Sequence, residues 1–587
     1  MYRSLLVAAT CACCLVGLSA ARGADAQPPR TLDFELRDAH GRAVRLADHQ
    51  DQKAVVLVFL GAECPLARLY GPRLVELAKE YGPRGVTFLG VDANTHDTPS
   101  EMLAYTQAYK IEFPLLKDAE NKLADQLGAT RTPEVFVLDP TGKVRYHGRV
   151  DDQYAVGAQR DKPARRDLAI ALDELLDGKD ISTATTPLAG CLISKVRRVA
   201  PHGDVTYTKH IAAIVNAHCV ECHRAGELAP FTLSSYDDVV AWADTIREVV
   251  DANRMPPWFA DPEHGKFSND CSLSAEKKQT LHTWIDNGCP QGDPADLPAP
   301  PVFTAGWRMG SEPDRVYRMP QPFTVAAEGT VDYQYFQIDP DLKEELWVSI
   351  AEARPGNAAV VHHVVLFAVP PSRKVKNLED AQVAGQMIAV YAPGMNPWRY
   401  PPGMAMKLEK GSQLILQLHY TPNGAAQDDS SYVGLKLAAP ETVKQQVRYG
   451  LVSNAGFVIP PHADNHEVKQ ATRIYKDVKV LNFFPHMHYR GKAFRFEAEY
   501  PDGRREVLLD VPHYDFSWQL RYDLAEPKLL PKGTRLECIA HYDNSAANPH
   551  NPDPSATVRF GLQSWEEMLV GYYTSIPAED DRTASKE

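Results

Sequence analysis

The sequence predicts a multidomain chain in which an α/β unit, a small all-α unit and an all-β region follow one another. Strand and helix signals alternate over 27–186, short helical patterns fill 207–291, and short alternating apolar runs dominate 303–580. Polar linkers at 187–206 and 292–302 separate these segments. Because 587 residues are too many for one hydrophobic core, separate folding units are the expected arrangement.

The segment 1–26 is typical of an export signal. Tyr2-Arg3 precedes an apolar run from 5 to 18, and Ala24-Asp25-Ala26 fits a cleavage site with small residues. The run is too short to span a bilayer, and three cysteines inside it would leave with the signal. A lipidated cysteine at the new N-terminus is the alternative. We therefore expect an exported protein, periplasmic or secreted, with no transmembrane segment in the mature chain.

The net charge of −13 provides no basic surface excess for nucleic acid or an anionic membrane, so neither is an expected partner. Seven cysteines remain after the export signal, and export places them in an oxidising compartment. Pairing is therefore expected for some of the cysteines that no cofactor uses.

The α/β unit is predicted from buried strands that alternate with helices. The continuous apolar run 54–60 is typical of a strand covered on both faces, and it leads through Cys64 into a helical pattern. A second buried strand covers 86–91, and 134–147 forms a hairpin around an Asp-Pro-Thr-Gly turn. This order, with Thr132-Pro133 before the hairpin, resembles the thioredoxin and redoxin (peroxiredoxin-like) family. The resemblance implies a thioredoxin-like fold, with Thr132-Pro133 as the family's cis-proline loop.

Cys64 is the candidate catalytic residue of this unit. It begins a helix, where backbone amides and the helix dipole stabilise a thiolate. Ala67 replaces the second cysteine of a thioredoxin Cys-x-x-Cys, and Gly61 stands where peroxiredoxins place Thr or Ser. Dithiol exchange within the motif is therefore excluded, and peroxidase activity is not favoured. Cys191 is a candidate partner in a Cys64–Cys191 disulfide, with a free Cys64 or a structural bond as the alternatives.

Cys219-Val220-Glu221-Cys222-His223 fits covalent attachment of a c-type haem. Cys219 and Cys222 would add across the haem vinyl groups, and His223 would become the proximal iron ligand. A zinc half-site or a redox Cys-x-x-Cys are the alternatives. Zinc is disfavoured because no second Cys-x-x-Cys completes a ligand set.

The small helical unit carries this motif near its start. Met255, in a Met-Pro-Pro sequence, follows as the candidate sixth iron ligand, with histidines of the same unit as competitors and a core methionine as the structural alternative. The order of haem motif and methionine resembles a class I cytochrome c. Cys271 and Cys289 flank the last helix of the unit and could staple it with a disulfide.

The all-β region places histidines on predicted strands. His486 and His488 lie two apart, so their imidazoles share one face of a strand. His362 and His363 are adjacent and could bind one metal only at a bulge or a strand end. His419 comes from another strand. Imidazole sets of this kind suit copper or zinc, and a thioether ligand favours copper because Cu(I) is soft.

The segment 303–580 resembles the copper type II ascorbate-dependent monooxygenases, the family of peptidylglycine and dopamine hydroxylases. The matching motifs follow the family's order and are Val361-His362-His363-Val364, Leu416-Gln417-Leu418-His419-Tyr420, Pro485-His486-Met487-His488, and Glu567-Met568 with Tyr572 behind it. The resemblance implies tandem β-sandwiches at 303–460 and 461–580. It also implies two coppers. The copper held by His362, His363 and His419 would relay electrons, and the copper held by His486, His488 and Met568 would bind O2 and abstract hydrogen from a substrate C–H bond.

Two positions depart from the peptidylglycine enzymes. Phe484 and Val570 stand where those enzymes carry arginine and asparagine, whereas Tyr572 is retained as a candidate catalytic residue. The charged clamp for a carboxylate is therefore missing. This difference favours a small substrate that is neutral or apolar.

Together these patterns predict an exported oxidoreductase with one covalent haem c and two copper ions. The haem unit would pass electrons from an external donor to a copper monooxygenase that consumes O2. Tethering raises the effective concentration of donor at acceptor to roughly millimolar. The alternatives are a non-catalytic electron-transfer or copper-binding protein, and a thiol-dependent peroxidase with accessory domains.

Overall fold

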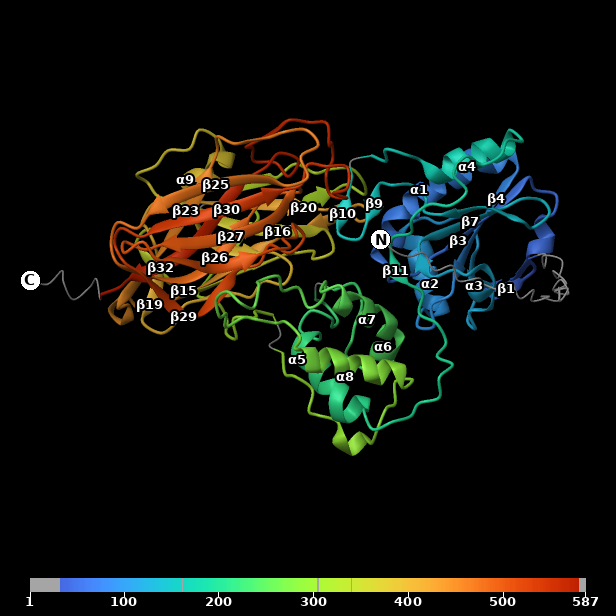
Figure 1. Ribbon diagram of the computed structural model, residues 1–587, viewed down its shortest axis with the longest axis horizontal. Coiled ribbons are helices and arrows are strands. Elements are labelled where there is room, and N and C mark those ends of the chain that lie inside the picture. Colours follow the sequence, from blue (N-terminus) through green and yellow to red (C-terminus); the bar gives the residue numbers. More distant parts are fainter. Residues whose placement is uncertain (1–31, 161, 228, 304–305, 339, 580–587) are drawn as a thin grey trace, which may run out of the picture.

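The computed structural model describes residues 32–579 apart from 161, 228, 304–305 and 339. The expected export signal at 1–26 lies outside these residues. An N-terminal α/β unit, a helical unit and a large all-β region follow one another along the chain (Figure 1). Among the described residues, no helix combines the length and the apolar character that a membrane crossing needs.

A seven-stranded sheet forms the centre of the N-terminal unit. Its strands in spatial order are β2 (Ala43–Arg45), β1 (Glu35–Asp38), β5 (Leu115–Lys117), β4 (Val86–Asp92), β3 (Ala54–Phe59), β7 (Glu134–Leu138) and β8 (Val144–Gly148). Strands β3, β4 and β5 run parallel, and every residue of β3 is buried, as its continuous apolar run predicts. The helices are α1 (Pro65–Tyr81), α2 (Pro99–Ala108), α3 (Lys122–Leu127) and α4 (Asp167–Leu176). The expected thioredoxin-like α/β fold is therefore confirmed.

The region expected as the first linker, 187–206, contributes a strand to this unit. Strand β11 (Cys191–Leu192) pairs antiparallel with β6 (Arg131–Thr132), and Cys191 lies opposite Thr132. The Thr132–Pro133 peptide bond is cis, as the family resemblance implies. The α/β unit thus extends past 186, because β6 offers backbone hydrogen bonds that β11 completes.

The second unit is small and all-α, as expected. A π-helical turn at Tyr207–Ile211 leads into α5 (Ala212–His218), and the remaining helices are α6 (Tyr236–Ala241), α7 (Ala243–Asp251) and α8 (Ala275–Asp286). Its core forms around Trp284, which is fully buried and donates its indole N–H to the carbonyl oxygen of Pro290 at 3.0 Å. This hydrogen bond satisfies the one polar group of the indole.

The all-β region is built on a nine-stranded sheet. Its main path is β12 (Arg315–Arg318), β22 (Tyr432–Leu437), β15 (Leu346–Arg354), β19 (Met404–Leu408), β23 (Gln445–Asn454), β32 (Leu569–Pro577), β26 (Val478–His486) and β29 (Tyr522–Leu530), with β18 (Trp398–Arg399) beside β15. Strands from both expected sandwiches take part. The tandem sandwiches therefore share one sheet, in which β23 of the first half pairs with β32 of the second.

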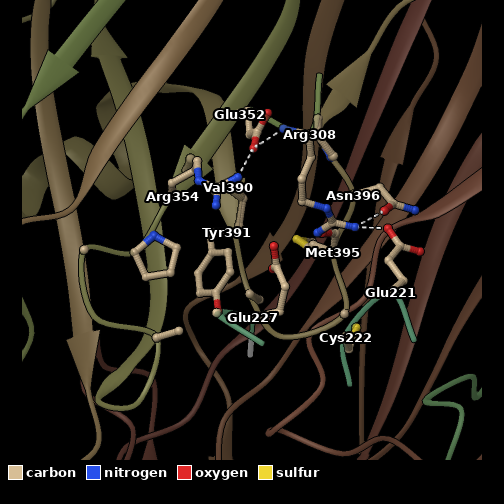
Figure 2. A pocket seen from close by; sticks show the side chains of 18 residues that line it. Glu221, Cys222, Glu227, Arg308, Glu352, Arg354, Val390, Tyr391, Met395 and Asn396 are labelled. Atoms are coloured by element: carbon tan, nitrogen blue, oxygen red, sulfur yellow. Dashed lines mark hydrogen bonds and ion pairs between the residues drawn. The ribbon is translucent and has the colours of Figure 1, made fainter. Parts of the chain in front are cut away.

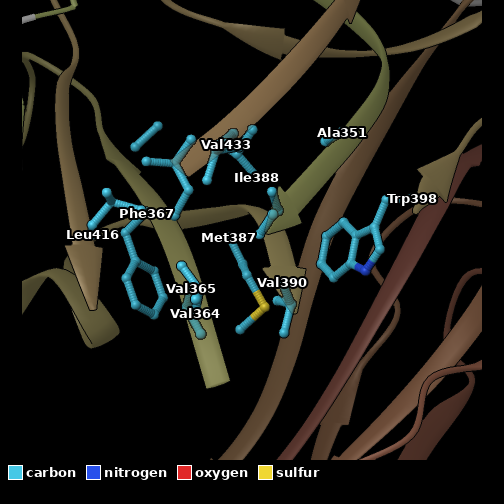
Figure 3. Packing of buried hydrophobic residues seen from close by; sticks show 14 of the residues in the cluster. Ala351, Val364, Val365, Phe367, Met387, Ile388, Val390, Trp398, Leu416 and Val433 are labelled. Atoms are coloured by element: carbon cyan, nitrogen blue, oxygen red, sulfur yellow. The ribbon is translucent and has the colours of Figure 1, made fainter. Parts of the chain in front are cut away.

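Two four-stranded sheets cover this long sheet. The first contains β14 (Gln334–Ile338), β20 (Gln413–Tyr420), β16 (Val361–Val369) and β17 (Gln386–Tyr391). The second contains β25 (His466–Arg473), β30 (Arg535–Tyr542), β27 (Gly491–Glu499) and β28 (Arg505–Val511). Figure 3 shows Val364 and Phe367 of β16 packed in the first core together with Met387 and Val433. This packing fixes the strands that carry the histidines.

Each pair of units is in contact. Arg131 of the α/β unit pairs with Glu248 of α7 at 2.7 Å. In the all-β region, Ser517 donates its hydroxyl to the carbonyl oxygen of Gly157, at 3.2 Å, in the turn between β9 (Tyr154–Ala155) and β10 (Ala158–Gln159). The helical unit meets the all-β region through an ion pair between Glu221 and Arg308. The haem motif therefore lies against the first sandwich.

Candidate redox centres

Three imidazoles converge in the first sandwich, and we call them the first histidine set (His362, His363 and His419). One nitrogen of each ring lies within 4.8 Å of the others. The Nδ1 atoms of His363 and His419 each lie 3.3 Å from Nδ1 of His362. Spacings of this size match the edge of a tetrahedral site with metal–nitrogen bonds of about 2.0–2.1 Å. The set therefore fits a metal ion.

The convergence depends on a bulge, as the adjacent histidines require. In the β16–β20 pairing, Val361 lies opposite Tyr420 and His363 lies opposite His419, so that one extra residue is inserted on β16. The bulge turns His362 towards its neighbours although a regular strand would point it to the other face. The bulge that shared binding of one metal by this pair would require is therefore present.

The surroundings keep the first histidine set neutral and oriented. Burial lowers the pKa of His362 to about 4 and lowers the pKa values of His363 and His419 as well. His363 Nε2 donates to Gln417 Oε1 at 3.3 Å, which leaves Nδ1 as its ligand atom. Gln417 in turn donates its amide to the Tyr335 hydroxyl at 3.1 Å. Such outer hydrogen bonds fix the tautomer of metal-binding histidines.

A second group, the second ligand set (His486, His488 and Met568), lies at the end of β26 and the start of β32. The rings of His486 and His488 are 5.2 Å apart, and Met568 is 3% exposed. His486 Nδ1 donates to Gln519 at 2.8 Å, and His488 Nδ1 donates to the carbonyl oxygen of Glu566 at 3.4 Å. His488 Nε2 is buried and has no hydrogen-bond partner among the described residues. Both rings therefore keep Nε2 for a metal.

The fully buried carboxylate of Glu567 holds this second set together. It accepts backbone N–H groups from His488 at 2.9 Å, Arg490 at 2.6 Å and Met568 at 3.2 Å. Burial raises the pKa of Glu567 to about 7, although these hydrogen bonds favour its ionised form. One side chain thereby fixes the backbone positions of two candidate ligands.

Phe516 lies between the two sets. Its ring stacks on His362 at 5.1 Å and meets His488 edge to face at 6.0 Å. The side chain is 6% exposed and lies on the loop between β28 and β29, which also carries Gln519. The two sets are thus separated by an aromatic ring.

Tyr572, the candidate catalytic tyrosine, lies beside the second set. Its ring is 6.1 Å from the ring of His486 and 5.7 Å from that of Phe484, and it stacks on Tyr449 at 5.5 Å. Burial raises the pKa of Tyr572, so the hydroxyl stays protonated at neutral pH. Phe484, which stands where the peptidylglycine enzymes carry arginine, therefore packs among the aromatic rings beside His486.

The haem motif forms a turn after α5, and its residues fit a covalently bound haem. His223 Nδ1 donates to the carbonyl oxygen of Phe231 at 3.2 Å, so Nε2 is the atom left to bind iron. Burial lowers the pKa of His223 and raises that of Cys219 to about 12. A raised pKa disfavours the thiolate that a redox Cys-x-x-Cys needs. Met255 is half-buried in the turn after α7, and its N–H donates to Val249 at 3.2 Å.

Cys64 and Cys191 meet at the edge of the α/β unit. Cys64 is the N-cap residue of α1 and is 2% exposed, and its sulfur lies 3.0 Å from the carbonyl oxygen of Thr132. Burial alone would raise the pKa of Cys64, but a hydrogen bond from Cys191 and other donors lowers it to about 6. The same contact with Cys64 raises the pKa of Cys191. At neutral pH the pair therefore consists of a Cys64 thiolate and a Cys191 thiol that keeps its proton.

The other cysteines remain separate. All seven cysteines of the described residues are free thiols, and the expected staple between Cys271 and Cys289 is not formed. Cys271 contacts the carbonyl oxygen of Pro257 at 3.5 Å, whereas Cys289 is buried in the helical core after α8. Burial raises the pKa of each of these two thiols. Cys538 is buried in the second sandwich.

Several residues of these centres carry no strong signal in the sequence. Gln417 is part of the matched histidine motif, and Glu567 adjoins Met568, but neither position by itself indicates a supporting hydrogen bond. Gln519 and Phe516 come from a loop more than 25 residues after His488. Only the fold brings that loop between the two sets.

Comparison with known proteins finds relatives of the α/β unit. Residues 29–147 match the AhpC/TSA family. The thiol-disulfide oxidoreductase ResA of Geobacillus thermodenitrificans is 30% identical over 113 residues, which are 19% of this chain and 63% of that protein. A putative chloroplastic peroxiredoxin Q of Oryza sativa subsp. indica is 27% identical over 121 residues, 19% of this chain and 54% of that protein. The chain therefore spans less than two thirds of the length of these relatives.

Solved structures give matches to parts of the chain. A hypothetical protein of Sinorhizobium meliloti is 31% identical, with a TM-score of 0.26, and the match covers 28% of this chain and 93% of that protein. A putative thiol:disulfide interchange protein of Chlorobium tepidum is 22% identical, with a TM-score of 0.19, over 20% of this chain and 80% of that protein.

Proposed function

We propose that the protein is an exported copper-dependent monooxygenase that receives electrons through its own c-type haem. The observation that carries this proposal is the convergence of the first histidine set, whose neutral nitrogens lie within 4.8 Å of one another. A second set of two imidazoles and a thioether lies across a single phenylalanine ring. Three imidazoles at one site and two imidazoles with a thioether at the other suit a copper that cycles between Cu(I) and Cu(II).

Copper bound at these sites would supply O2 binding and hydroxylation of a C–H bond, in which RH, O2, two electrons and two protons give ROH and water. His362, His363 and His419 would hold the ion that stores an electron. His486, His488 and Met568 would hold the ion that supplies the O2 chemistry. Glu567 and Gln519 position the second set, since each fixes the backbone or the ring orientation of a ligand.

The walls beside the second set favour a neutral or apolar substrate. Phe484, Val570 and Tyr572 are all buried there. Phe484 and Val570 stand where the peptidylglycine enzymes, which this segment resembles, carry arginine and asparagine. An apolar wall excludes water and gives no partner to a charged group. The Tyr572 hydroxyl remains protonated and can donate a hydrogen bond to a substrate oxygen.

Purified protein tests this proposal directly. Metal analysis should find two coppers and one haem per chain, and reduced protein should consume O2 in step with product when a suitable small apolar substrate is present. Met568→Leu should abolish product while copper stays at the first histidine set. Oxygen consumption that never depends on substrate would support the non-catalytic electron-transfer alternative, and zinc in place of copper would contradict the oxygen chemistry.

A second activity, thiol–disulfide exchange in the α/β unit, is favoured by the hydrogen bond between Cys64 and Cys191. The Cys64 thiolate would attack a substrate disulfide and release one thiol as a thiolate. Cys191 would then lose its proton and attack the mixed disulfide, which releases the second thiol and leaves a Cys64–Cys191 disulfide. ResA, one of the relatives, is named as a thiol-disulfide oxidoreductase.

The Cys191→Ala variant separates this exchange from the peroxidase alternative. It should trap Cys64 in a mixed disulfide with a disulfide substrate, detected by mass spectrometry, whereas Cys64→Ser should trap nothing. The peroxidase alternative receives less support, because Gly61 stands where peroxiredoxins place Thr or Ser, and a Cβ there would lie 2.5 Å from Asn94 Nδ2. Peroxide consumption that Cys64→Ser abolishes would restore it.

A further inference from the structure

The haem-attachment turn lies on an edge strand of the sheet that carries the first histidine set. Strand β17 is the outer strand of that sheet, and one edge of such a strand carries backbone groups without a partner strand. The side chain of Arg308 clamps the two together: it pairs with Glu221, inside the haem motif, and donates to Asn396 at 2.8 Å and to the carbonyl oxygen of Met395 at 3.2 Å. The contact is therefore built from specific charged and polar groups.

A small cavity lies inside this contact (Figure 2). Cys222 and Glu227 of the helical unit form one wall, and Tyr391 of β17 forms part of the opposite wall. The cavity holds about 130 Å³. Ligand pockets for small molecules measure roughly 300–1,000 Å³. The space is thus too small for a substrate, and it lies where the haem edge attached to Cys222 would approach β17.

Tyr391 is the aromatic residue that faces the haem motif across this cavity. Figure 2 shows Tyr391, Glu227 and Cys222 around the cavity. The hydroxyl oxygen is buried and has no hydrogen-bond partner within the part of the chain that the structure describes. Burial, together with the nearby Cys222 and Glu227, raises its pKa, so the phenol keeps its proton. A buried phenol without a partner carries a desolvation cost that packing alone does not explain.

One strand pairing connects Tyr391 with the first histidine set. In the β16–β17 ladder, Tyr391 lies directly opposite Val364. Val364 follows His363 in the chain, and neighbouring strands of a sheet are about 4.7–4.9 Å apart. The path from the cavity to a copper ligand therefore consists of one aromatic side chain, one set of backbone hydrogen bonds and one peptide link.

We propose that this contact is the electron-transfer junction of the protein and that Tyr391 couples the haem edge at Cys222 to the first histidine set. This inference rests on the proposed copper and haem sites. One electron passes per event: ferrous iron is oxidised to ferric, and Cu(II) at the first histidine set is reduced to Cu(I). No bond breaks, no proton moves and Tyr391 keeps its hydroxyl hydrogen. Two events supply the two electrons that each hydroxylation consumes.

Fast photochemical reduction of the haem in anaerobic, copper-loaded full-length protein tests the junction. The haem spectrum should return to the ferric form in a phase that requires copper. Tyr391→Leu should slow that phase by about tenfold or more, which corresponds to a barrier higher by about 1.4 kcal/mol. Tyr391→Phe keeps the ring and should stay close to wild type. Tyr317→Leu is the matched control, because Tyr317 is also a buried tyrosine with an unpartnered hydroxyl in the described structure, but it does not line the cavity.

A second readout needs no metal. In copper-free protein, Arg308→Ala should raise amide hydrogen exchange in β17 and the following turn, 386–396, because the clamp on the edge strand is lost. Tyr391→Leu with full haem and copper content and an unchanged rate would overturn the inference. Normal electron transfer without any hydroxylation would leave the junction intact and overturn only the proposed monooxygenase. Absence of copper or haem from the wild-type protein would overturn both.

Discussion

At the scale of single residues, the candidate metal sites depend on side chains that are not metal ligands themselves but orient the ligands. Gln417 sets the tautomer of His363, and Gln519 does the same for His486. Glu567 holds the backbone of His488 and Met568. Because each of these groups is buried, removing one leaves a polar partner without a hydrogen bond as well as a ligand without orientation.

Gln417→Leu should weaken copper binding at the first histidine set by about 10–100-fold, as the loss of an outer hydrogen bond typically does. The matched control is Gln413→Leu, at the exposed start of the same strand β20. Competition with a chelator of known copper affinity measures both. Equal copper affinity in the two variants would contradict the orienting role of Gln417.

Cys64 gives a second prediction at this scale. Alkylation of Cys64, followed on its own peptide by mass spectrometry, should have a midpoint near pH 6 and slow as the pH falls through that value, because the thiolate is the reactive form. Cys191→Ala removes the hydrogen bond that favours the thiolate, so the midpoint should move up towards the usual thiol value of about 8.5. Cys271→Ala should leave it unchanged. An unchanged midpoint in Cys191→Ala would contradict the pairing.

At the scale of elements, strand β32 unites the two halves of the all-β region. It pairs with β23 on one side and with β26 on the other, and it begins next to Met568. Gly571 lies within it, and a Cβ there would be 2.3 Å from Cys538 Sγ and 2.8 Å from the ring of Phe496. The strand thus approaches β30 and β27 more closely than any other residue would permit.

Gly571→Ala should lower the free energy of unfolding of the all-β region by about 1–3 kcal/mol, the usual cost of overpacking a core. Adding Cys538→Ala removes the nearest atom and should restore part of this loss. Thermal unfolding followed by circular dichroism measures both variants. No rescue in the double variant would show that the clash with Phe496 alone decides the outcome.

Sequence patterns predict some of these elements and miss others. The buried strands β3 and β4, the hairpin of β7 and β8, and the histidine-bearing strands β16, β20 and β26 lie where apolar periodicity predicts them. Strand β11 lies in a segment that the sequence predicts to be a linker, because two residues give no periodic pattern and pair only with the distant β6. The shared nine-stranded sheet was also not predicted, since strand order depends on contacts across the chain.

At the scale of the whole molecule, three units meet pairwise, and the redox centres lie near their contacts. The haem motif lies against the first sandwich, and the loop that carries Phe516 also contacts the turn between β9 and β10 of the α/β unit. Cys191 lies between the α/β and helical units, beside the ion pair of Arg131 and Glu248. This arrangement would place the proposed electron carriers next to one another, so that electron transfer would not rely on diffusion.

The extent of the α/β unit can be tested with fragments. A fragment 27–206 contains β11 and should keep the lowered pKa of Cys64, measured as the alkylation midpoint. A fragment 27–186 lacks Cys191 and the buried Ile193, so its midpoint should rise and its melting temperature should fall. Identical behaviour of the two fragments would place the end of the unit at 186 after all.

The sequence alone indicated the kinds of chemistry that are proposed for this chain. The haem motif, the six candidate copper ligands and Cys64 are recognisable because ligand type and spacing are local properties of the chain. Only the tertiary structure decided which of these groups meet. It brought Cys191 to Cys64, placed Phe516 between the two ligand sets and set Tyr391 opposite the haem motif, because contacts between distant segments depend on strand register and packing rather than on any local pattern.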